Sequence, residues 1–282
     1  MNSNPAFSRN PAFRPGQVSR SELERIYGEG GTGNTTAPVD TERLEEAYSL
    51  PSATPAQAGR MTVEDTVVKT ILSFAILIAG AVVGWTLADP LVMIGGAIGG
   101  LVLGLVNTFK KTPSPALIVA YAILQGLFVG SISVIFNTMW DGIVTQAVVG
   151  TIAVIGITMF LFLSGRFRSS ARMTKIVSVA MIGYLVYSVA NVLLMVTGVT
   201  GNSPFGLSSM NFFGIPLGVV IGLVVVFLAA YSLVLDFESI KLGADRGVPA
   251  VYAWQGAFGI LVTVVWLYLE ILRMLAILRG SD

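Results

Sequence analysis

The chain has 282 residues, of which 54% are hydrophobic and only 12% are charged, and its formal net charge is +1 at pH 7. Soluble domains carry roughly 25% charged residues, so this composition excludes a water-soluble globule, and the small net charge excludes a basic field for nucleic acid. The absence of cysteine and histidine excludes disulfides, thiol nucleophiles, imidazole metal ligands and Ser-His-Asp triads.

Residues 1–60 are predicted to form a disordered cytoplasmic tail. They are rich in charged residues, proline and glycine, and such a composition buries too little apolar area to offset chain entropy. The sequence NPAF occurs twice, at residues 4–7 and 10–13. A docking motif built on this repeat is the alternative interpretation of the tail. No apolar core of a signal peptide is visible within it.

The second domain, residues 61–282, is predicted to contain seven membrane-spanning helices. A helix needs about 20 apolar residues to cross a hydrocarbon core of about 30 Å. The uncharged stretch 176–235 fits two crossings, divided by turn-forming residues at 198–212. The predicted segments are 66–88, 90–109, 115–138, 142–164, 174–197, 213–236 and 253–278. Three prolines are expected in the first turn of a helix, where the missing N–H costs little. They are Pro90, Pro115 and Pro216.

Lysine and arginine predict the orientation of these segments. Basic residues follow the second, fourth and sixth segments, whereas none follows the first, third or fifth. Basic loops stay cytoplasmic, so the N-terminus is predicted to be cytoplasmic. Seven crossings then place Arg279 and Arg273 towards the outer side. An incomplete last crossing is the alternative.

Small and polar residues within the segments predict helix packing. Glycines at GxxxG spacing let helix backbones approach closely in a membrane, and the second segment carries Gly95, Gly96, Gly99, Gly100 and Gly104. We expect packing within the chain, with dimerisation through this face as the alternative. Hydrogen bonds between helices are expected from Gln125, Tyr184, Tyr187 and Asn191.

Ionisable residues inside a predicted span are the candidates for function, because they are expensive to place there. Glu270 lies well inside the last segment, and Arg273 follows three residues later on the same helical face. Asp236 and Glu238 lie at the cytoplasmic end of the sixth segment. Glu270 is interpreted either as the partner of a structural ion pair with Arg273 or as a proton- or cation-sensing carboxylate. A metal bound here would be a hard cation such as Ca²⁺.

Three motifs resemble the Bax inhibitor-1-like (TMBIM) family of membrane proteins over roughly residues 61–280. They are QGLFVG at 125–130, LDFESI at 235–240 and LYLEILR at 267–273. The extended tail with NPAF looks like that of actinobacterial members, which implies a bacterial plasma membrane. The resemblance implies an all-α fold with six helices around a central seventh.

The resemblance also implies a function. Bacterial relatives are described as pH-sensitive Ca²⁺ leak channels whose sensor is a pair of aspartates, acting with an arginine in the second segment. Asp236 matches the first aspartate, and Glu270 matches the second as LYLE against the family's LYLD. In place of the arginine, only Lys110 and Lys111 lie at the cytoplasmic end of the second segment. Calcium at Asp236 and Glu270 is therefore expected, without any other cofactor.

Three functions are compatible with the sequence. The first is a cation leak gated by carboxylate protonation. The second is a regulator that binds another membrane protein, such as a protease or a component of stress or cell-death responses, without transport. The third is a secondary transporter, which the lack of a clear internal repeat disfavours. An enzyme is not expected, because no nucleophile–base pair or metal-ligand cluster is visible. The expected surroundings are the lipid bilayer, protons and cations.

Overall fold

The computed structural model describes residues 59–165, 168–199, 205–212 and 214–280. Within these ranges, seven helices are long and apolar enough to cross a membrane, so the predicted count is confirmed. They are α4 (Val63–Leu87), α5 (Pro90–Phe109), α6 (Pro115–Met139), α7 (Ile143–Leu163), α8 (Ala171–Val196), α9 (Leu217–Asp245) and α10 (Tyr252–Arg279). Of the predicted tail at residues 1–60, only Gly59 and Arg60 are described.

Six of the seven helices agree with their predicted bounds to within one helical turn. Asp89, Thr62 and Ser170 each cap a helix start by accepting backbone N–H groups. Prolines occupy the first turn of α5 and α6 as expected. The sixth helix differs, because α9 continues to Asp245 instead of ending at residue 236. Pro216 lies at its N-cap and not in its first turn.

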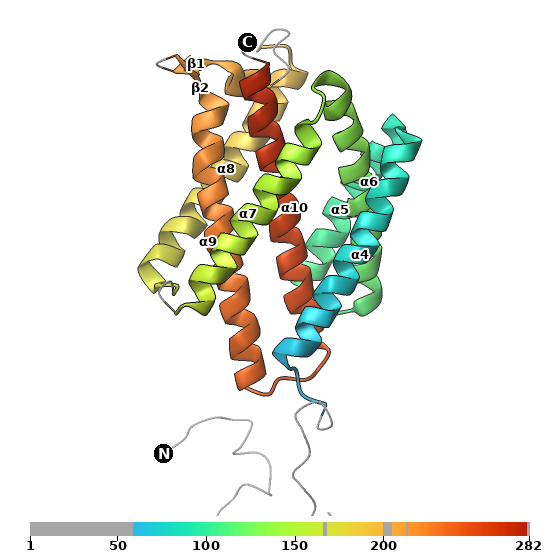
Figure 1. Cartoon of the computed structure of the whole chain (residues 1–282), viewed down its shortest axis with the longest axis vertical. Coiled ribbons are helices and arrows are strands. Elements are labelled where there is room, and N and C mark those ends of the chain that lie inside the picture. Colours follow the sequence, from blue (N-terminus) through green and yellow to red (C-terminus); the bar gives the residue numbers. More distant parts are fainter. Residues whose placement is uncertain (1–58, 166–167, 200–204, 213, 281–282) are drawn as a thin grey trace, which may run out of the picture. The chain divides into compact units, whose positions relative to one another are not determined.

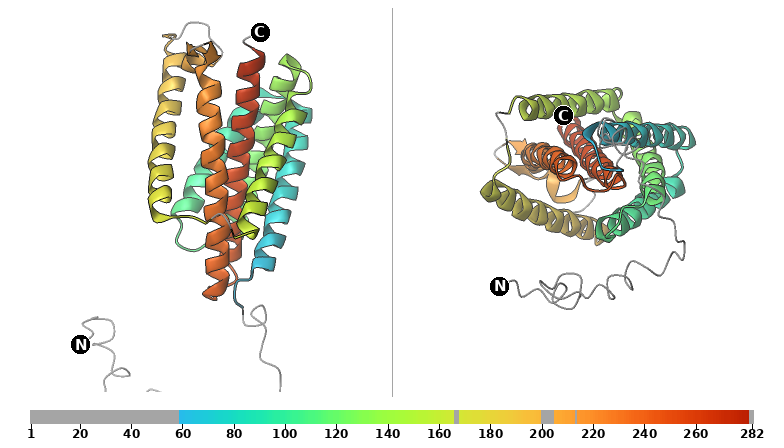
Figure 2. Two further views of the ribbon diagram at one scale, coloured as in Figure 1. Left: turned by 60° about the vertical axis from the view of Figure 1, so that its left-hand side comes forward. Right: turned by 90° about the horizontal axis from the view of Figure 1, so that it is seen from below.

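Helix α10 lies at the centre of the bundle. It packs against α9, α4, α7 and α6, and the view along the bundle in Figure 2 shows it inside a ring of the other helices. Most of its length is buried, including Leu261, Leu267 and Leu272. Helix α5 lies outside α6, against which it packs. The expected arrangement of six helices around a central seventh is thereby confirmed.

The closest helix contact joins α4 to α6 through glycines of both helices. A methyl group added at Gly80 would lie 2.9 Å from the carbonyl oxygen of Ile123, and one at Gly130 would overlap the carbonyl of Ala81. Gly126 likewise lies directly against α4. Such contacts need residues without side chains on both helices. The close approach of α4 therefore explains the two glycines of the QGLFVG motif.

Helix α5 uses its own glycines to pack on the other side of α6. A methyl group at Gly96 would lie 2.8 Å from the carbonyl oxygen of Leu124. Gly100 lies under the side chain of Gln125, and Gly104 faces Tyr121. The GxxxG pattern of α5 is thus used within the chain, as expected. Within the described part of the chain, the side chain of Gln125 does not form the expected hydrogen bond and instead fills the space above Gly100.

The two ends of the bundle bring distant loops together (Figure 1). At one end, Met61 donates its N–H to the carbonyl of Val248 at 2.7 Å, so the start of α4 lies beside the α9–α10 loop. At the other end, Arg279 donates to the carbonyl of Asp141 at 2.8 Å. The short helix η2 (Gly206–Ser209) and the hairpin β1 (Asn211–Phe212) and β2 (Ile215–Pro216) precede α9.

The seventh span is complete in length. Helix α10 extends from Tyr252 to Arg279 without interruption. Its last residue reaches the loop between α6 and α7, which lies at the far end from the basic loops. The length of α10 therefore favours a full last crossing over the alternative of an incomplete one.

Candidate functional site

Glu270 is the centre of a buried polar cluster inside the bundle. Only 3% of its surface is exposed. Its Oε1 accepts a hydrogen bond from Nη2 of Arg273 at 2.5 Å, and its Oε2 accepts one from the hydroxyl of Tyr184 at 2.6 Å. Residues three apart on a helix share a face, which brings the two ionised side chains together. The predicted Glu270–Arg273 ion pair is therefore formed.

Arg273 extends this cluster towards the end of the bundle at which η2 lies. Its Nη1 donates to the hydroxyl of Ser208 in η2 at 3.2 Å, and that hydroxyl lies 2.8 Å from the hydroxyl of Tyr187. The guanidinium also lies 5.9 Å from the ring centre of Tyr184. Its Nε is buried without a hydrogen-bond partner among the described residues. One polar network thus connects α8, η2 and α10.

Helix α8 is held to the bundle by polar side chains and by an apolar cluster that it forms with α9. Tyr184, Tyr187 and Asn191 recur at helical spacing and face the same side. Asn191 accepts the N–H of Leu207 at 2.7 Å and donates to the carbonyl of Phe205 at 3.2 Å. The hydrogen bonds expected from these three residues are confirmed. Of the remaining residues of α8, only Val177 is fully buried, and it packs in an apolar cluster with Leu228 of α9.

Asp236 occupies a different level of the bundle. Its Oδ2 accepts a hydrogen bond from the hydroxyl of Thr263 in α10 at 2.8 Å. Its Oδ1 lies over Gly259, where an added methyl group would be only 3.1 Å away. The carboxylate is half-buried between α9 and α10.

The structure does not bring Asp236 and Glu270 together. Facing pairs along the antiparallel helices α9 and α10 are Ile240–Gly256, Asp236–Gly259 and Gly222–Met274. This register places Glu270 beside the part of α9 near Val226. At about 1.5 Å of rise per residue, the two carboxylates are separated by about 15 Å along the bundle. The paired sensor that the resemblance implies is not assembled in this structure.

Three other charged residues named from the sequence lie near the basic end of the bundle, away from Glu270: Glu238, Lys110 and Lys111. Glu238 accepts hydrogen bonds from both the N–H and the hydroxyl of Ser169, the former at 2.7 Å. Lys110 and Lys111 are exposed at the end of α5. The hydroxyl of Tyr252 donates to the carbonyl of Lys111 at 3.4 Å. These residues tie loops together and make no hydrogen bond or ion pair with Asp236 or Glu270.

The geometry limits how a cation could be held. Calcium takes six to eight oxygen ligands at about 2.3–2.6 Å, so carboxylates about 15 Å apart cannot share one ion. Among the described residues, no group of three or more acidic, histidine or cysteine side chains is close enough to hold a metal. Calcium at Asp236 or at Glu270 separately stays a prediction.

Two partners of the carboxylates were not recognised in the sequence. Thr263 faces Asp236 because α9 continues past that residue and sets the register with α10. Tyr184 reaches Glu270 across the interface between α8 and α10, where its ring also packs against Trp266. The spacing of Tyr184, Tyr187 and Asn191 on one face of α8 was the available signal. A polar face on a membrane helix needs buried partners, and Glu270 supplies one.

Comparisons with known proteins bear on this arrangement of seven helices. A comparison with curated proteins finds no similar sequence. The family model described as Bax inhibitor 1 like matches residues 4–280, which extends the match beyond the membrane helices into the N-terminal segment. The chain therefore belongs to the Bax inhibitor 1 like family of membrane proteins.

Proposed function

We propose that this protein is a pH-sensitive cation leak in which protonation of Glu270 releases α8 from the central helix. The observation that carries the proposal is the position of Glu270, a buried carboxylate in a membrane span that binds Arg273 and Tyr184 at once. Ionisable residues at such depth are typical of ion and proton pathways. Calcium is the cation that the family resemblance suggests.

Protonation would remove the negative partner of a buried cation. Arg273 stays charged at any physiological pH, and an unpaired charge inside the bundle is unfavourable. Its guanidinium would turn towards the outer end, which its side chain already approaches with 23% exposure. Tyr184 would lose its ionic acceptor at the same time. Both changes weaken the attachment of α8.

A mostly apolar cavity lies beside this contact. It has a volume of about 350 Å³ between α8 and α9 and is lined by Tyr184, Tyr187, Gly183 and Val225, among others. Outward movement of α8 would widen this space along the faces of α9 and α10. Asp236, farther along the same two helices, would then be the second carboxylate that a cation meets. The two carboxylates act in sequence in this proposal and not as one pair.

Calcium flux into proteoliposomes tests the proposal. The proposed gate predicts that flux through the wild-type protein rises as the pH falls. Glu270→Gln mimics the protonated side chain, so its flux should be high and nearly independent of pH. Asp236→Asn should lower flux at every pH. Glu64→Gln is the control, because Glu64 is an exposed carboxylate at the start of α4. A wild-type pH dependence in Glu270→Gln would refute the proposed gate.

A regulator that binds other membrane proteins is the second candidate. It is favoured by the charge balance at Glu270, where Arg273 already neutralises the carboxylate and leaves no net negative site for a cation. Under this alternative, purified wild-type protein gives no flux at any pH. A partner protein should then co-purify with the full chain and be lost when residues 1–60 are deleted.

The same proposal includes an orientation. The ends of α5, α7 and α9 carry Lys110, Arg168 and Lys241, and all three helix ends lie at the end of the bundle where α4 begins. Basic residues favour the cytoplasmic side. We therefore place the N-terminus of the chain in the cytoplasm and the Glu270 cluster towards the outer half of a bacterial plasma membrane.

A further inference from the structure

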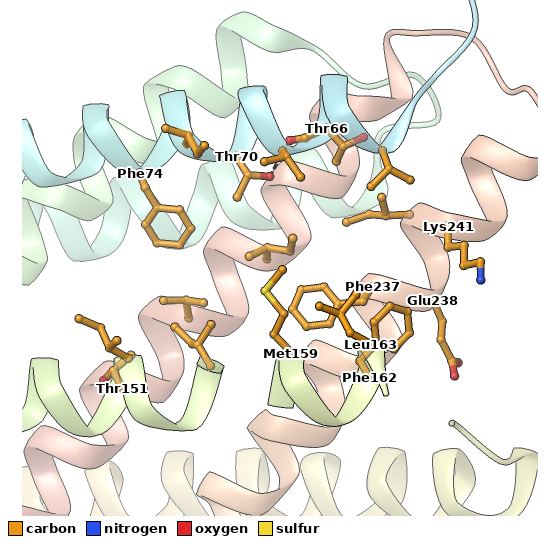
Figure 3. A pocket seen from close by; sticks show the side chains of 18 of the residues that line it. Thr66, Thr70, Phe74, Thr151, Met159, Phe162, Leu163, Phe237, Glu238 and Lys241 are labelled. Atoms are coloured by element: carbon orange, nitrogen blue, oxygen red, sulfur yellow. Dashed lines mark hydrogen bonds between the residues drawn. The ribbon is translucent and has the colours of Figure 1, made fainter. Parts of the chain in front are cut away.

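A second, larger cavity lies on the side of the bundle away from the Glu270 cluster. Its volume is about 1210 Å³, and its walls come from α4, α7, α9 and α10. Figure 3 shows Thr66, Thr70 and Phe74 of α4 facing Thr151 and Met159 of α7 across the space, with α9 and α10 between them. Helix α4 packs on α6 and α10, whereas α7 packs on α10 and α9. The space between α4 and α7 is thus left open.

Away from the mouth of this cavity, the hydroxyl groups in its walls already take part in hydrogen bonds within the protein. The three threonine hydroxyls bond to backbone carbonyls of their own helices: Thr66 to Thr62 at 2.9 Å, Thr70 to Thr66 at 2.8 Å and Thr151 to Ala147 at 2.7 Å. The hydroxyl of Tyr268 lies 2.6 Å from that of Ser133. Methyl groups and aliphatic chains remain to face the space. This part of the cavity, away from its mouth, suits a hydrocarbon chain.

The length of the cavity matches one leaflet of a bilayer. It extends along α4 from Val63 to Ile78 and along α7 from Leu163 to Val148. At 1.5 Å of rise per residue, either helix covers about 22 Å over this length. Half of a bilayer, headgroups included, is about 20–22 Å thick. A cavity of this length, with its mouth at the headgroup level, would end near the bilayer midplane.

The mouth of the cavity carries charges of both signs. Arg168, Lys241, Glu238 and Asp245 line it at the basic end of the bundle. None of these four side chains is in an ion pair within the described part of the chain. Glu238 is fixed by its hydrogen bonds to Ser169. Two cations beside two carboxylates complement a headgroup that contains both a phosphate and an ammonium.

We propose that this cavity binds a phospholipid of the cytoplasmic leaflet whose headgroup carries a primary ammonium. One acyl chain lies between α4 and α7. The phosphate binds Arg168 and Lys241, as phosphates bind guanidinium and ammonium groups elsewhere. The primary ammonium donates hydrogen bonds to Asp245 and Glu238. This site is separate from the Glu270 cluster, so it does not depend on the proposed leak function.

Native mass spectrometry of the full chain tests the site. The protein in detergent is incubated with equal amounts of dioleoyl phosphatidylethanolamine and dioleoyl phosphatidylglycerol, which differ only in the headgroup. We expect one bound phosphatidylethanolamine, preferred by roughly threefold, as exposed ion pairs of this kind allow. Asp245→Asn should remove the preference.

Two tryptophan variants distinguish lipid binding in the cavity from lipid binding elsewhere on the membrane-facing surface of the protein. Ile152 lines the cavity and is 63% exposed, whereas Ile182 lies on α8 outside it and is 62% exposed. Ile152→Trp should lower lipid retention at least threefold, and Ile182→Trp should not. Equal retention by the two variants would show that the cavity is not the site. Equal or stronger retention of phosphatidylglycerol by the wild type would overturn the headgroup assignment.

Discussion

Replacing Arg273 by glutamine should destabilise the protein more than any other single change in the Glu270 cluster. The variant leaves a carboxylate with 3% exposure bonded only to Tyr184. Removing one partner of a buried ion pair costs about 3–5 kcal/mol. Because Arg273 itself keeps 23% side-chain exposure, we expect about 3 kcal/mol, the lower end of this range.

The double variant Glu270→Gln with Arg273→Gln should recover part of this loss. Its two amides are neutral and can hydrogen-bond to each other and to Tyr184. We expect a coupling of about 2 kcal/mol between the two positions, which is within the range for residues in contact. Arg279→Gln is the control, because Arg279 only reaches a backbone carbonyl at the helix end.

The free energy of unfolding can be measured for the wild type, the two single variants, the double variant and Arg279→Gln by titrating mixed micelles with SDS at pH 8 and at pH 5. Acid neutralises the carboxylate that Arg273→Gln leaves unpaired, so the deficit of this variant should shrink at pH 5. Additive effects of the two substitutions, or a deficit that grows in acid, would contradict the ion pair as described.

Two further predictions concern packing and topology. Gly130→Ala should lower stability by about 1–3 kcal/mol, since its methyl group overlaps the backbone of α4. Gly183→Ala is the control and should be neutral or stabilising, because open space surrounds Gly183. Equal shifts of the thermal unfolding temperature in the two variants would refute the close contact. The chain contains no cysteine, so single cysteine substitutions can report on which side of the membrane a residue lies. In intact cells, a membrane-impermeant maleimide should label Thr138→Cys but not Thr112→Cys, and the reverse pattern would invert the proposed orientation.

Much of the fold could be predicted because the bilayer fixes the length of each helix. Uncharged stretches near 20 residues, separated by turn residues, identified all seven spans. The end of α9 was predicted too early because Asp236 and Glu238 resemble the end of a span. In the structure, α9 carries both residues and continues to Asp245. A charge pattern marks where a helix meets water or a polar partner, and not where its backbone hydrogen bonds stop.

The candidate site could be predicted only in part. The Glu270–Arg273 pair follows from helical spacing within one segment, and the structure forms it. The contact between Asp236 and Thr263 depends on the register of two helices, which the sequence of either helix alone does not specify. The glycine contact of α4 with α6 was missed for the same reason, although both helices carry GxxxG spacing. Contacts between helices can be predicted only when the arrangement of the helices in the bundle is known.

The movement of α8 is the central claim of the proposed function, and a distance measurement tests it most directly. Spin labels at Ile182→Cys in α8 and Leu101→Cys in α5, two exposed positions, report this movement by pulsed electron resonance. The distance distribution should shift when the pH falls, and Glu270→Gln should show the acid distribution already at neutral pH. A reference pair at Val82 and Leu101 should stay constant. Distributions that are the same at both pH values and in Glu270→Gln would contradict the account.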